Sequence, residues 1–146
     1  MRVLVQKVLE ASVSVDNKLI NKIDSGLLLF VGFTHTDNET VIDQMVNKVI
    51  NLRIFEDEND VMNKSILDVG GEILSISQFT LQADTKKGNR PSYINAMRGE
   101  DAIKLYELFN EELNKEIKTY PGVFGADMEV QIVNDGPTTI ILDTRQ

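Results

Sequence analysis

The sequence contains no cysteine and a single histidine among its 146 residues. The missing cysteines exclude disulfide bonds and thiolate metal sites. No apolar run approaches the ~20 residues that a membrane-spanning helix needs, and residues 1–5 lack the long apolar region of a signal peptide. We therefore expect a cytoplasmic protein that does not enter a membrane. Its length predicts one domain over residues 1–146.

The familiar signatures of catalysis are also missing. The chain contains no HExxH, GxSxG, P-loop or GxGxxG pattern. The only histidine, His35, precedes a predicted helix in a polar segment, where a solvated side chain is typical. A Ser-His-Asp triad would have to use His35, and nothing in the sequence places a serine near it. No metal or other cofactor is predicted.

Positive charge is scarce, because the formal net charge is −8. Taken alone, this charge argues against a protein that grips a nucleic-acid backbone. The segment 86–98 differs, since it has no acidic residue and contains Lys86, Lys87, Arg90 and Arg98. A basic loop is often only solvated, but beside a site it can hold a few phosphates.

Apolar periodicity predicts strands at 3–8, 11–15, 19–23, 27–31, 72–80, 128–132 and 138–142. One amphipathic helix is expected to begin at a capping box formed by Thr36 and Glu39 and to run to Ile50. A second is expected over roughly residues 100–117, and residues 56–65 are expected to form a loop. Short turns between strands favour antiparallel pairing. These elements predict an α+β fold, with a mostly antiparallel, barrel-like or sandwiched sheet and both helices packed on one side.

Two short motifs stand out at the ends of predicted strands. Ser77-Gln78-Phe79-Thr80-Leu81 closes an apolar run, and on a strand Gln78 and Thr80 would share one face. The run also fits an ordinary strand, in which Thr80 is simply a β-branched residue. Asn134-Asp135-Gly136-Pro137 joins two β-like runs, where Asp-Gly is a hairpin signal that Pro137 weakens.

Taken in order, these motifs and their neighbours resemble the D-aminoacyl-tRNA deacylases over most of the chain. The matching blocks are Val5-Gln6-Lys7-Val8, Ala11-Ser12-Val13, Met62-Asn63, Ser77-Gln78-Phe79-Thr80-Leu81, Ala83-Asp84, Gly88, Arg90-Pro91-Ser92, Phe124, Ala126-Asp127-Met128 and Asn134-Asp135-Gly136-Pro137. Two positions depart from the family: Lys7 stands where many members have arginine, and Thr138 where valine is usual. Lys7 lacks the planar fork of an arginine.

The resemblance implies hydrolysis of the ester that joins a D-amino acid to the 3′ end of a tRNA, with glycyl-tRNA as a further substrate. It implies a homodimer whose site lies near the subunit interface. The Gly136-Pro137 bond is implied to be cis, with carbonyls that enter the partner's pocket and reject L-amino acids by a clash. The implied residues are Gln78, Phe79 and Thr80 for catalysis, Ser77, Met128, Gly136 and Pro137 for substrate binding, and Lys86, Lys87 and Arg90 for tRNA binding.

Two mechanisms and one non-catalytic alternative remain open at this point. In the favoured mechanism, backbone N–H groups around Gln78 and Phe79 stabilise the oxyanion and the ribose 2′-OH assists the water. In the rival mechanism, Thr80 is the nucleophile, although no base is evident to activate it. The alternative is a non-catalytic module that binds an RNA end or an amino acid.

Overall fold

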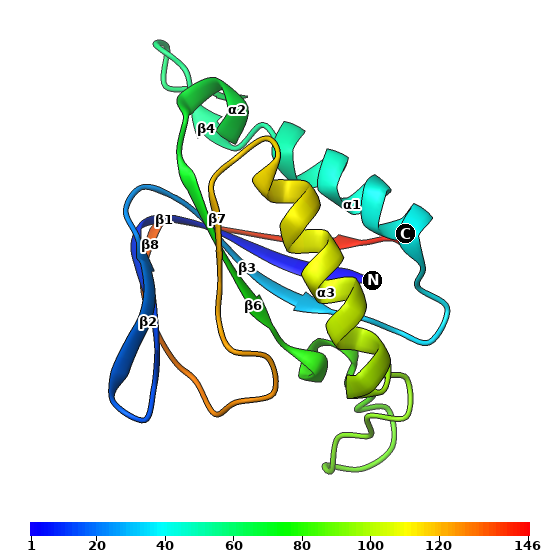
Figure 1. Cartoon of the computed structure of the whole chain (residues 1–146). Helices are drawn as coiled ribbons and strands as arrows, with labels where there is room; N and C mark the ends of the chain where they lie inside the picture. Colours follow the sequence, from blue (N-terminus) through cyan, green and yellow to red (C-terminus); the bar gives the residue numbers. More distant parts are fainter.

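The computed structural model describes residues 1–146 and is built around a curved, nearly closed six-stranded sheet (Figure 1). The strands are β1 (Arg2–Val15), β2 (Lys18–Ile23), β3 (Gly26–Gly32), β6 (Glu72–Ser77), β7 (Thr119–Pro121) and β8 (Glu129–Asp143). Long β1 pairs antiparallel with β2, β3 and β8. The pairs β3–β6 and β6–β7 are parallel. The predicted α+β class with a mostly antiparallel, barrel-like sheet is confirmed, although the two parallel pairs were not predicted.

Helices α1 (Glu39–Asn51) and α3 (Gly99–Asn114) cover one face of this sheet, as predicted (Figure 1). Their apolar stripes meet the inward side chains of β1 and β3, which include Val3, Val5 and Leu29. The buried helical residues are Ile42, Met45, Val46, Val49 and Ile50 from α1, and Ala102, Tyr106, Phe109 and Leu113 from α3. None of the helices has the length and the apolar composition that a membrane-spanning helix requires.

Helix α1 begins at a different cap from the one predicted. The side chain of Asn38 accepts a hydrogen bond from the Val41 N–H at 3.1 Å. Asp37 fixes the preceding turn, because its carboxylate accepts from the Thr34 N–H at 2.8 Å. The predicted capping box of Thr36 and Glu39 is therefore wrong, because the N-cap lies two residues later, at Asn38. Asn and Thr are both favoured N-caps, so composition alone did not discriminate between them.

The segment 56–65 is more ordered than the expected loop. Strands β4 (Phe55–Glu56) and β5 (Met62–Lys64) pair antiparallel, and α2 (Ile66–Val69) follows. The connecting turn is held by the Asp57 carboxylate, which accepts from the N–H groups of Asn59 and Val61. A capping box of Ser65 and Asp68 starts α2. Carboxylates in this acidic stretch therefore satisfy backbone donors.

Strand β6 ends at Ser77, three residues earlier than predicted. Its last ladder bond is from the Gln78 N–H to the Val31 carbonyl at 2.8 Å. The neighbouring strand β3 ends at Gly32, so the chain beyond Gln78 has no strand to pair with. Residues Phe79–Gln82 instead form a 3₁₀ helix, η1. The expectation that Gln78 and Thr80 share a strand face is therefore wrong.

The C-terminal region is one continuous strand rather than the expected hairpin. Both halves of β8 pair antiparallel with β1, and the register shifts where residues 135–138 bulge outward. Asn134 secures the bulge by donating from Nδ2 to the carbonyls of Lys7 at 2.9 Å and Thr138 at 3.1 Å. Gly136 has a φ of +118°, which favours glycine. The Asp-Gly signal therefore marks a bulge, because the 14-residue β1 is long enough to pair with β8 on both sides of it.

Candidate functional site

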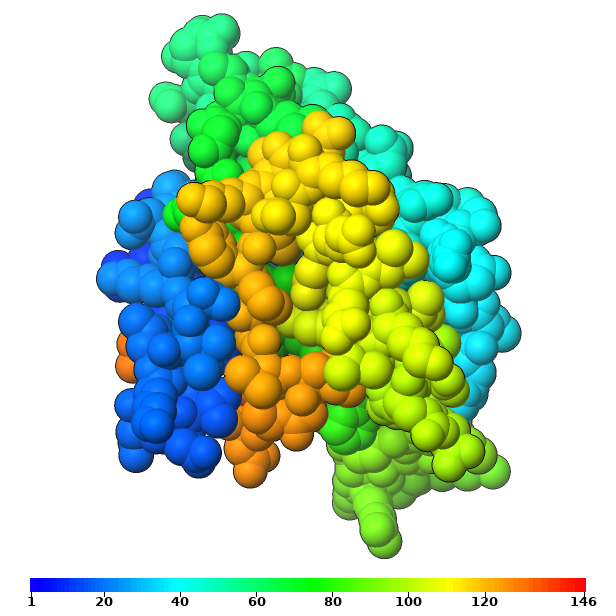
Figure 2. Space-filling view, viewed as in Figure 1, coloured from blue at the N-terminus to red at the C-terminus, as the bar shows by residue number.

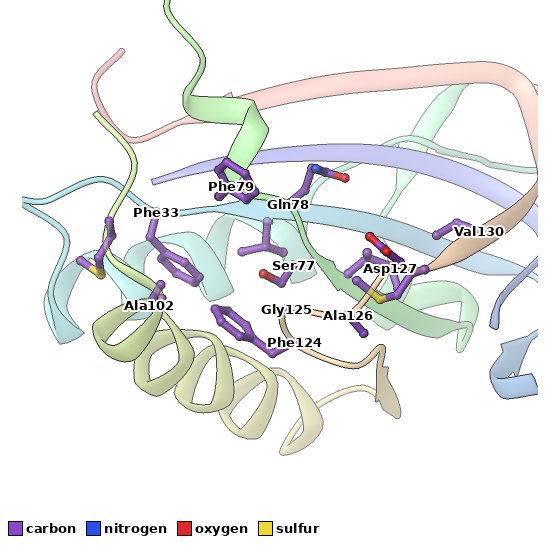
Figure 3. Close-up of a pocket in the computed structure, with 16 residues that line it drawn as sticks. Phe33, Ser77, Gln78, Phe79, Ala102, Phe124, Gly125, Ala126, Asp127 and Val130 are labelled. Carbon is purple, nitrogen blue, oxygen red and sulfur yellow. The ribbon is translucent and has the colours of Figure 1, made fainter. Parts of the chain in front are cut away.

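A cavity of about 540 Å³ opens where β6 ends and η1 begins. In Figure 2 green atoms of the β6 region are visible between α3 and the orange segment that precedes β8. The lining of this cavity comes from the ends of β3 and β6, the start of α3 and the residues before β8 (Figure 3). The lining residues are Val31, Gly32, Phe33, Ile76, Ser77, Gln78, Phe79, Met97, Gly99, Ala102, Phe124, Gly125, Ala126, Asp127, Met128 and Val130.

Four of the residues predicted from the sequence line this cavity: Ser77, Gln78, Phe79 and Met128. Figure 3 shows Phe33, Ser77 and Phe124 around the cavity, with Phe79 on the helical turn above them. Thr80 does not line the cavity, but its Oγ1 accepts a hydrogen bond from Gln78 Nε2 at 2.5 Å. The structure therefore brings the Ser-Gln-Phe-Thr motif to one end of the pocket.

The backbone donors in this motif differ from those expected. The Gln78 N–H already donates to the Val31 carbonyl at 2.8 Å, so it is not free to serve an oxyanion. The first hydrogen bond of η1 runs from the Leu81 N–H to the Gln78 carbonyl at 3.3 Å. The N–H groups of Phe79 and Thr80 precede that first helical bond and have no acceptor within the helix. Phe79 is thus the candidate donor among the lining residues.

Ionisable groups are nearly absent from the cavity wall. Asp127 is the only charged side chain among the lining residues, and it is exposed. The single histidine lies elsewhere, with His35 Nε2 at 2.7 Å from the carbonyl oxygen of Ile94. No group of three or more His, Asp or Glu side chains is placed to hold a metal ion. The cavity therefore offers dipoles and apolar surface rather than an acid–base pair.

Several wall residues were given no site role from the sequence, although Phe124 stands in one of the matching blocks. Phe124 packs against Tyr106, with ring centroids 5.7 Å apart. Tyr106 is held in turn by a hydrogen bond from its hydroxyl to the Ser75 carbonyl at 2.6 Å, and burial raises the pKa of this phenol. Ala102 falls within the second predicted helix, but helical spacing did not indicate its place in the cavity. Phe33 and Phe124 follow no periodic pattern, because both lie outside regular elements.

The basic loop lies beyond the rim of the cavity. Asp84 and Ser92 close it through two backbone hydrogen bonds of 2.8 and 2.9 Å. Lys86, Lys87 and Arg90 are exposed on this loop, which is part of the yellow-green region that projects from the body in Figure 2.

At the loop's base two exposed aromatic rings pack edge to face. Phe79 and Tyr93 have centroids 5.1 Å apart at an interplanar angle of 72°. These rings connect the basic loop to the cavity motif, because Phe79 also lines the cavity.

The two predicted residues of the bulge do not line the cavity. Gly136 and Pro137 are exposed on β8, and their peptide bond is cis, as the resemblance implied. The buried Lys7 reaches the bulge through the Asp135 carboxylate, 3.6 Å from its Nζ. Lys7 therefore contacts the bulge as a single cation.

Comparison with known proteins gives a consistent assignment. The family model for D-Tyr-tRNA(Tyr) deacylase matches residues 4–143. The chain is 54% identical to the D-aminoacyl-tRNA deacylase of Flavobacterium psychrophilum, over 99% of this chain and 98% of the relative. It is 55% identical to the D-aminoacyl-tRNA deacylase of Listeria monocytogenes, over 99% of this chain and 96% of the relative.

Two solved structures share the fold. One, the c-Myc DNA Unwinding Element Binding Protein, superposes with a TM-score of 0.94 at 42% identity and 99% coverage of both chains. Another, described as a probable eukaryotic D-amino acid tRNA deacylase, gives a TM-score of 0.83 at 16% identity and 97% coverage of both chains. At that identity the second likeness concerns the fold alone. The family match over residues 4–143 and the similar relatives show that the chain belongs to the D-Tyr-tRNA(Tyr) deacylase family, whose members are hydrolases acting on ester bonds.

Proposed function

We propose that this chain hydrolyses the ester bond of D-aminoacyl-tRNA and releases the free amino acid and the tRNA. The observation that carries the proposal is the placement of Ser77, Gln78 and Phe79 in the cavity wall of a chain from this family. An aminoacyl ester is already activated toward water, so a site without an acid–base pair suits this reaction. We take the cytoplasm to be its place of action and residues 1–146 to act as one domain.

The proposed chemistry relies on the backbone and on the substrate. A water oxygen attacks the ester carbonyl carbon, and the oxyanion that forms is stabilised by the Phe79 N–H, a contribution of about 2.7–4 kcal/mol per donor. The carbon–oxygen bond to the ribose then breaks, and the ribose oxygen leaves with a proton that originates from the water. The neighbouring 2′-OH positions the water. Gln78 and Thr80 shape this end of the cavity.

A second copy of the chain completes the site in this proposal. Gly136 and Pro137 lie outside their own chain's cavity, so they can serve only the cavity of a partner. Strand β8 pairs only with β1, so its outer edge is free to meet another chain. Four exposed apolar residues lie on these two strands: Leu9, Ile132, Val133 and Ile141. A homodimer that covers this surface supplies the bulge in trans.

The bulge provides the proposed chiral filter. Backbone carbonyls near Gly136 accept hydrogen bonds from the substrate's α-ammonium group, a feature that all amino acids share. An L-amino acid held in this way drives its side chain into the bulge, whereas a D-amino acid points it toward solvent. Glycine has no Cβ to clash, so glycyl-tRNA is also hydrolysed. One site thereby accepts many D-amino acids without a side-chain pocket.

A deacylation assay tests the proposal directly. The same tRNA, charged with D-tyrosine, L-tyrosine or glycine, is incubated with the purified protein, and release of the amino acid is followed. We expect rapid release of D-tyrosine and glycine and no release of L-tyrosine. If the protein binds the charged tRNA without hydrolysing any of the three, it is a binding module rather than an enzyme. Equal hydrolysis of D- and L-tyrosyl-tRNA would instead exclude the chiral filter.

A further inference from the structure

The rings of Phe79 and Tyr93 form an exposed aromatic pair at the rim of the cavity. Phe79 is 54% exposed and Tyr93 is 40% exposed, with ring centroids 5.1 Å apart. The next side chain along the chain, Ile94, is 76% exposed. Single exposed apolar residues are common on soluble proteins, but a group of neighbouring ones marks an interaction surface. The aromatic pair is therefore a candidate contact for a ligand.

The backbone that carries Tyr93 is fixed on both sides. Before it, the pair of backbone hydrogen bonds described above closes the basic loop. After it, His35 Nε2 lies 2.7 Å from the Ile94 carbonyl oxygen, and Thr34 Oγ1 donates to the Asn95 carbonyl at 2.7 Å. Phe79 is held by the turn of η1. Both rings are thus preorganised, which lowers the entropic cost of binding a ligand.

The geometry of the aromatic pair leaves ring faces available. The rings meet at an interplanar angle of 72°, so the edge of one ring covers a face of the other. The remaining faces are not covered within the pair, and both side chains stay exposed. A free aromatic face binds another flat π-system by stacking, and nucleobases are ligands of this kind.

The charge around the aromatic pair indicates which occupant fits. Lys86, Lys87 and Arg90 are exposed on the same loop. Residues 86–98 contain no acid, although the whole chain carries a charge of −8. Protein-binding surfaces are depleted of lysine, whereas aromatic rings beside cations are typical of sites for single-stranded nucleic acid. An unpaired base whose phosphates lie near the cations matches both features.

We propose that the aromatic pair is a stacking platform for the nucleobase that precedes the terminal adenosine. Phe79 belongs both to the cavity wall and to the aromatic pair, so a strand that leaves the cavity toward the basic loop passes the pair. With the terminal adenosine in the cavity, the preceding base is the first one outside it. The inference rests on the proposed function for the identity of the strand.

Stacking gives the platform a role that the loop cations do not have. Every base has a π-face, so the platform accepts any sequence, but the base must be unpaired. The stack fixes how far the strand enters the cavity and thereby places the ester beside the Phe79 N–H. Tyr93 is thus a positioning residue, which touches neither the ester nor the attacking water. Removing its ring should raise KM and leave kcat unchanged.

The test uses three D-tyrosyl esters. The first is on adenosine alone, and the second is on the RNA trinucleotide cytidine-cytidine-adenosine. The third is on the same trinucleotide without the middle base but with its ribose and phosphates. For Tyr93→Ala we expect KM on the intact trinucleotide to rise by about fivefold or more, the effect of alanine substitution at stacking aromatics. KM on the adenosine ester and on the abasic trinucleotide should stay as in the wild type.

Three further variants serve as controls. Tyr93→Phe keeps the ring and should match the wild type. Tyr93→Leu keeps apolar bulk against Phe79 but has no π-face, so it should behave like Tyr93→Ala. Wild-type KM values for Tyr93→Leu would show that Tyr93 only supports the loop and would overturn the platform. Val61→Ala removes an exposed apolar side chain between β4 and β5, outside the cavity wall, and should change no KM value.

Salt separates the platform from the loop cations. The rise of KM caused by Tyr93→Ala should be the same at low and high salt, because no charge is removed. An equal rise on the adenosine ester and the intact trinucleotide would place the aromatic pair against the terminal adenosine and overturn the proposal. An equal rise on the intact and abasic trinucleotides, or no rise, would exclude the base contact while the deacylase activity stands.

Failure of the proposed function gives a distinct result. If the wild type hydrolyses none of the D-tyrosyl esters, calorimetry with the uncharged trinucleotide, intact and abasic, still tests the platform. Tighter binding of the intact RNA by Tyr93→Phe but not by Tyr93→Ala would support the stacking contact. A preference for the intact RNA in both variants, or in neither, would overturn it.

Discussion

Gln78 Nε2 donates a hydrogen bond to Thr80 Oγ1 at 2.5 Å across the turn that starts η1. An amide group does not remove a proton from a hydroxyl, so this contact does not activate Thr80 as a nucleophile. The hydroxyl instead accepts, and it holds the Gln78 side chain at the edge of the cavity. The geometry thus favours a positioning role for Thr80.

Replacing Thr80 tests that role. Thr80→Ala should lose no more than about tenfold in kcat, equivalent to ~1.4 kcal/mol, because only the hydrogen bond to Gln78 is removed. Thr80→Ser keeps the hydroxyl and should stay close to the wild type. A loss of ~10⁴-fold in a folded Thr80→Ala protein, together with a trapped ester on Thr80 in the wild type, would establish the nucleophile mechanism.

Gly136→Ala tests the role of the bulge. A Cβ at this position would lie 2.5 Å from Thr138 Oγ1, and the φ of +118° is unfavourable for alanine. The bulge must therefore shift, and kcat/KM on D-tyrosyl-tRNA should fall. Gly70→Ala is the control, because Gly70 also has a positive φ of +73° but lies at the end of α2 with open space around it. It should retain full activity.

Mixing two impaired variants tests whether the site is shared between subunits. Gly136→Ala carries an intact cavity, and Phe79→Pro carries an intact bulge. When the two are co-expressed, half of the dimers are mixed, and each mixed dimer contains one complete site. Activity should return to about a quarter of the wild-type value. No recovery, or a monomer by light scattering, would exclude a site completed in trans.

The basic loop should contribute to tRNA binding mainly through charge. Changing Lys86 and Lys87 together to glutamine should weaken binding and reduce the slope of log Kd against log salt by one to two phosphate contacts. The preference for D- over L-tyrosyl-tRNA should remain, because phosphate contacts position the strand without reading the amino acid. An unchanged salt slope would remove this loop from the interface.

Asp143 should make stability depend on pH. Hydrogen bonds from Arg145 and Arg2 hold the pKa of its carboxyl below the ordinary value of 3.8. The ionised form is therefore favoured in the folded state, and its full stabilisation is present above the unfolded pKa. It is lost as the pH falls from 3.8 toward the lower folded pKa.

Asp143→Asn should reduce the free energy of unfolding at neutral pH by about 1.5–3 kcal/mol, the usual contribution of a hydrogen bond to a charged group. Urea unfolding at several pH values measures the difference from the wild type. The difference in the free energy of unfolding should shrink as the pH falls below 3.8. A constant difference across this range would show that the pair with Arg145 and Arg2 does not stabilise the fold through charge.

Periodicity predicted the strands and the two amphipathic helices because apolar burial is a regular signal along the chain. It failed where tertiary contacts decide the backbone. Residues 78–80 fit a strand by composition, but β3 ends at Gly32 and leaves them without a partner. Asp135-Gly136 fits a hairpin turn, but β1 is long enough for both halves of β8 to pair with it.

The site was predicted only in part, for a related reason. Ser77, Gln78, Phe79 and Met128 are carried by short motifs and were found from the resemblance to a family. Phe33 and Phe124 lie in irregular segments, and only the packing of the chain brings them together. The Gln78 N–H was expected to face the substrate, but the sheet uses it in the last bond to Val31.

The Phe79 backbone N–H is the proposed donor that stabilises the oxyanion. Phe79 is the first residue of η1, a helical position that tolerates proline, so Phe79→Pro removes the N–H with little disturbance of the helix. Phe79→Ala is the matched control, because it removes the ring and its contact with Tyr93 but keeps the donor.

The deciding measurement is the ratio of kcat on D-tyrosyl-tRNA between Phe79→Ala and Phe79→Pro, with circular dichroism confirming that both variants fold. We expect the proline variant to be slower by about 10²–10³-fold, the usual effect of losing one oxyanion donor. Equal kcat values for the two variants would contradict it.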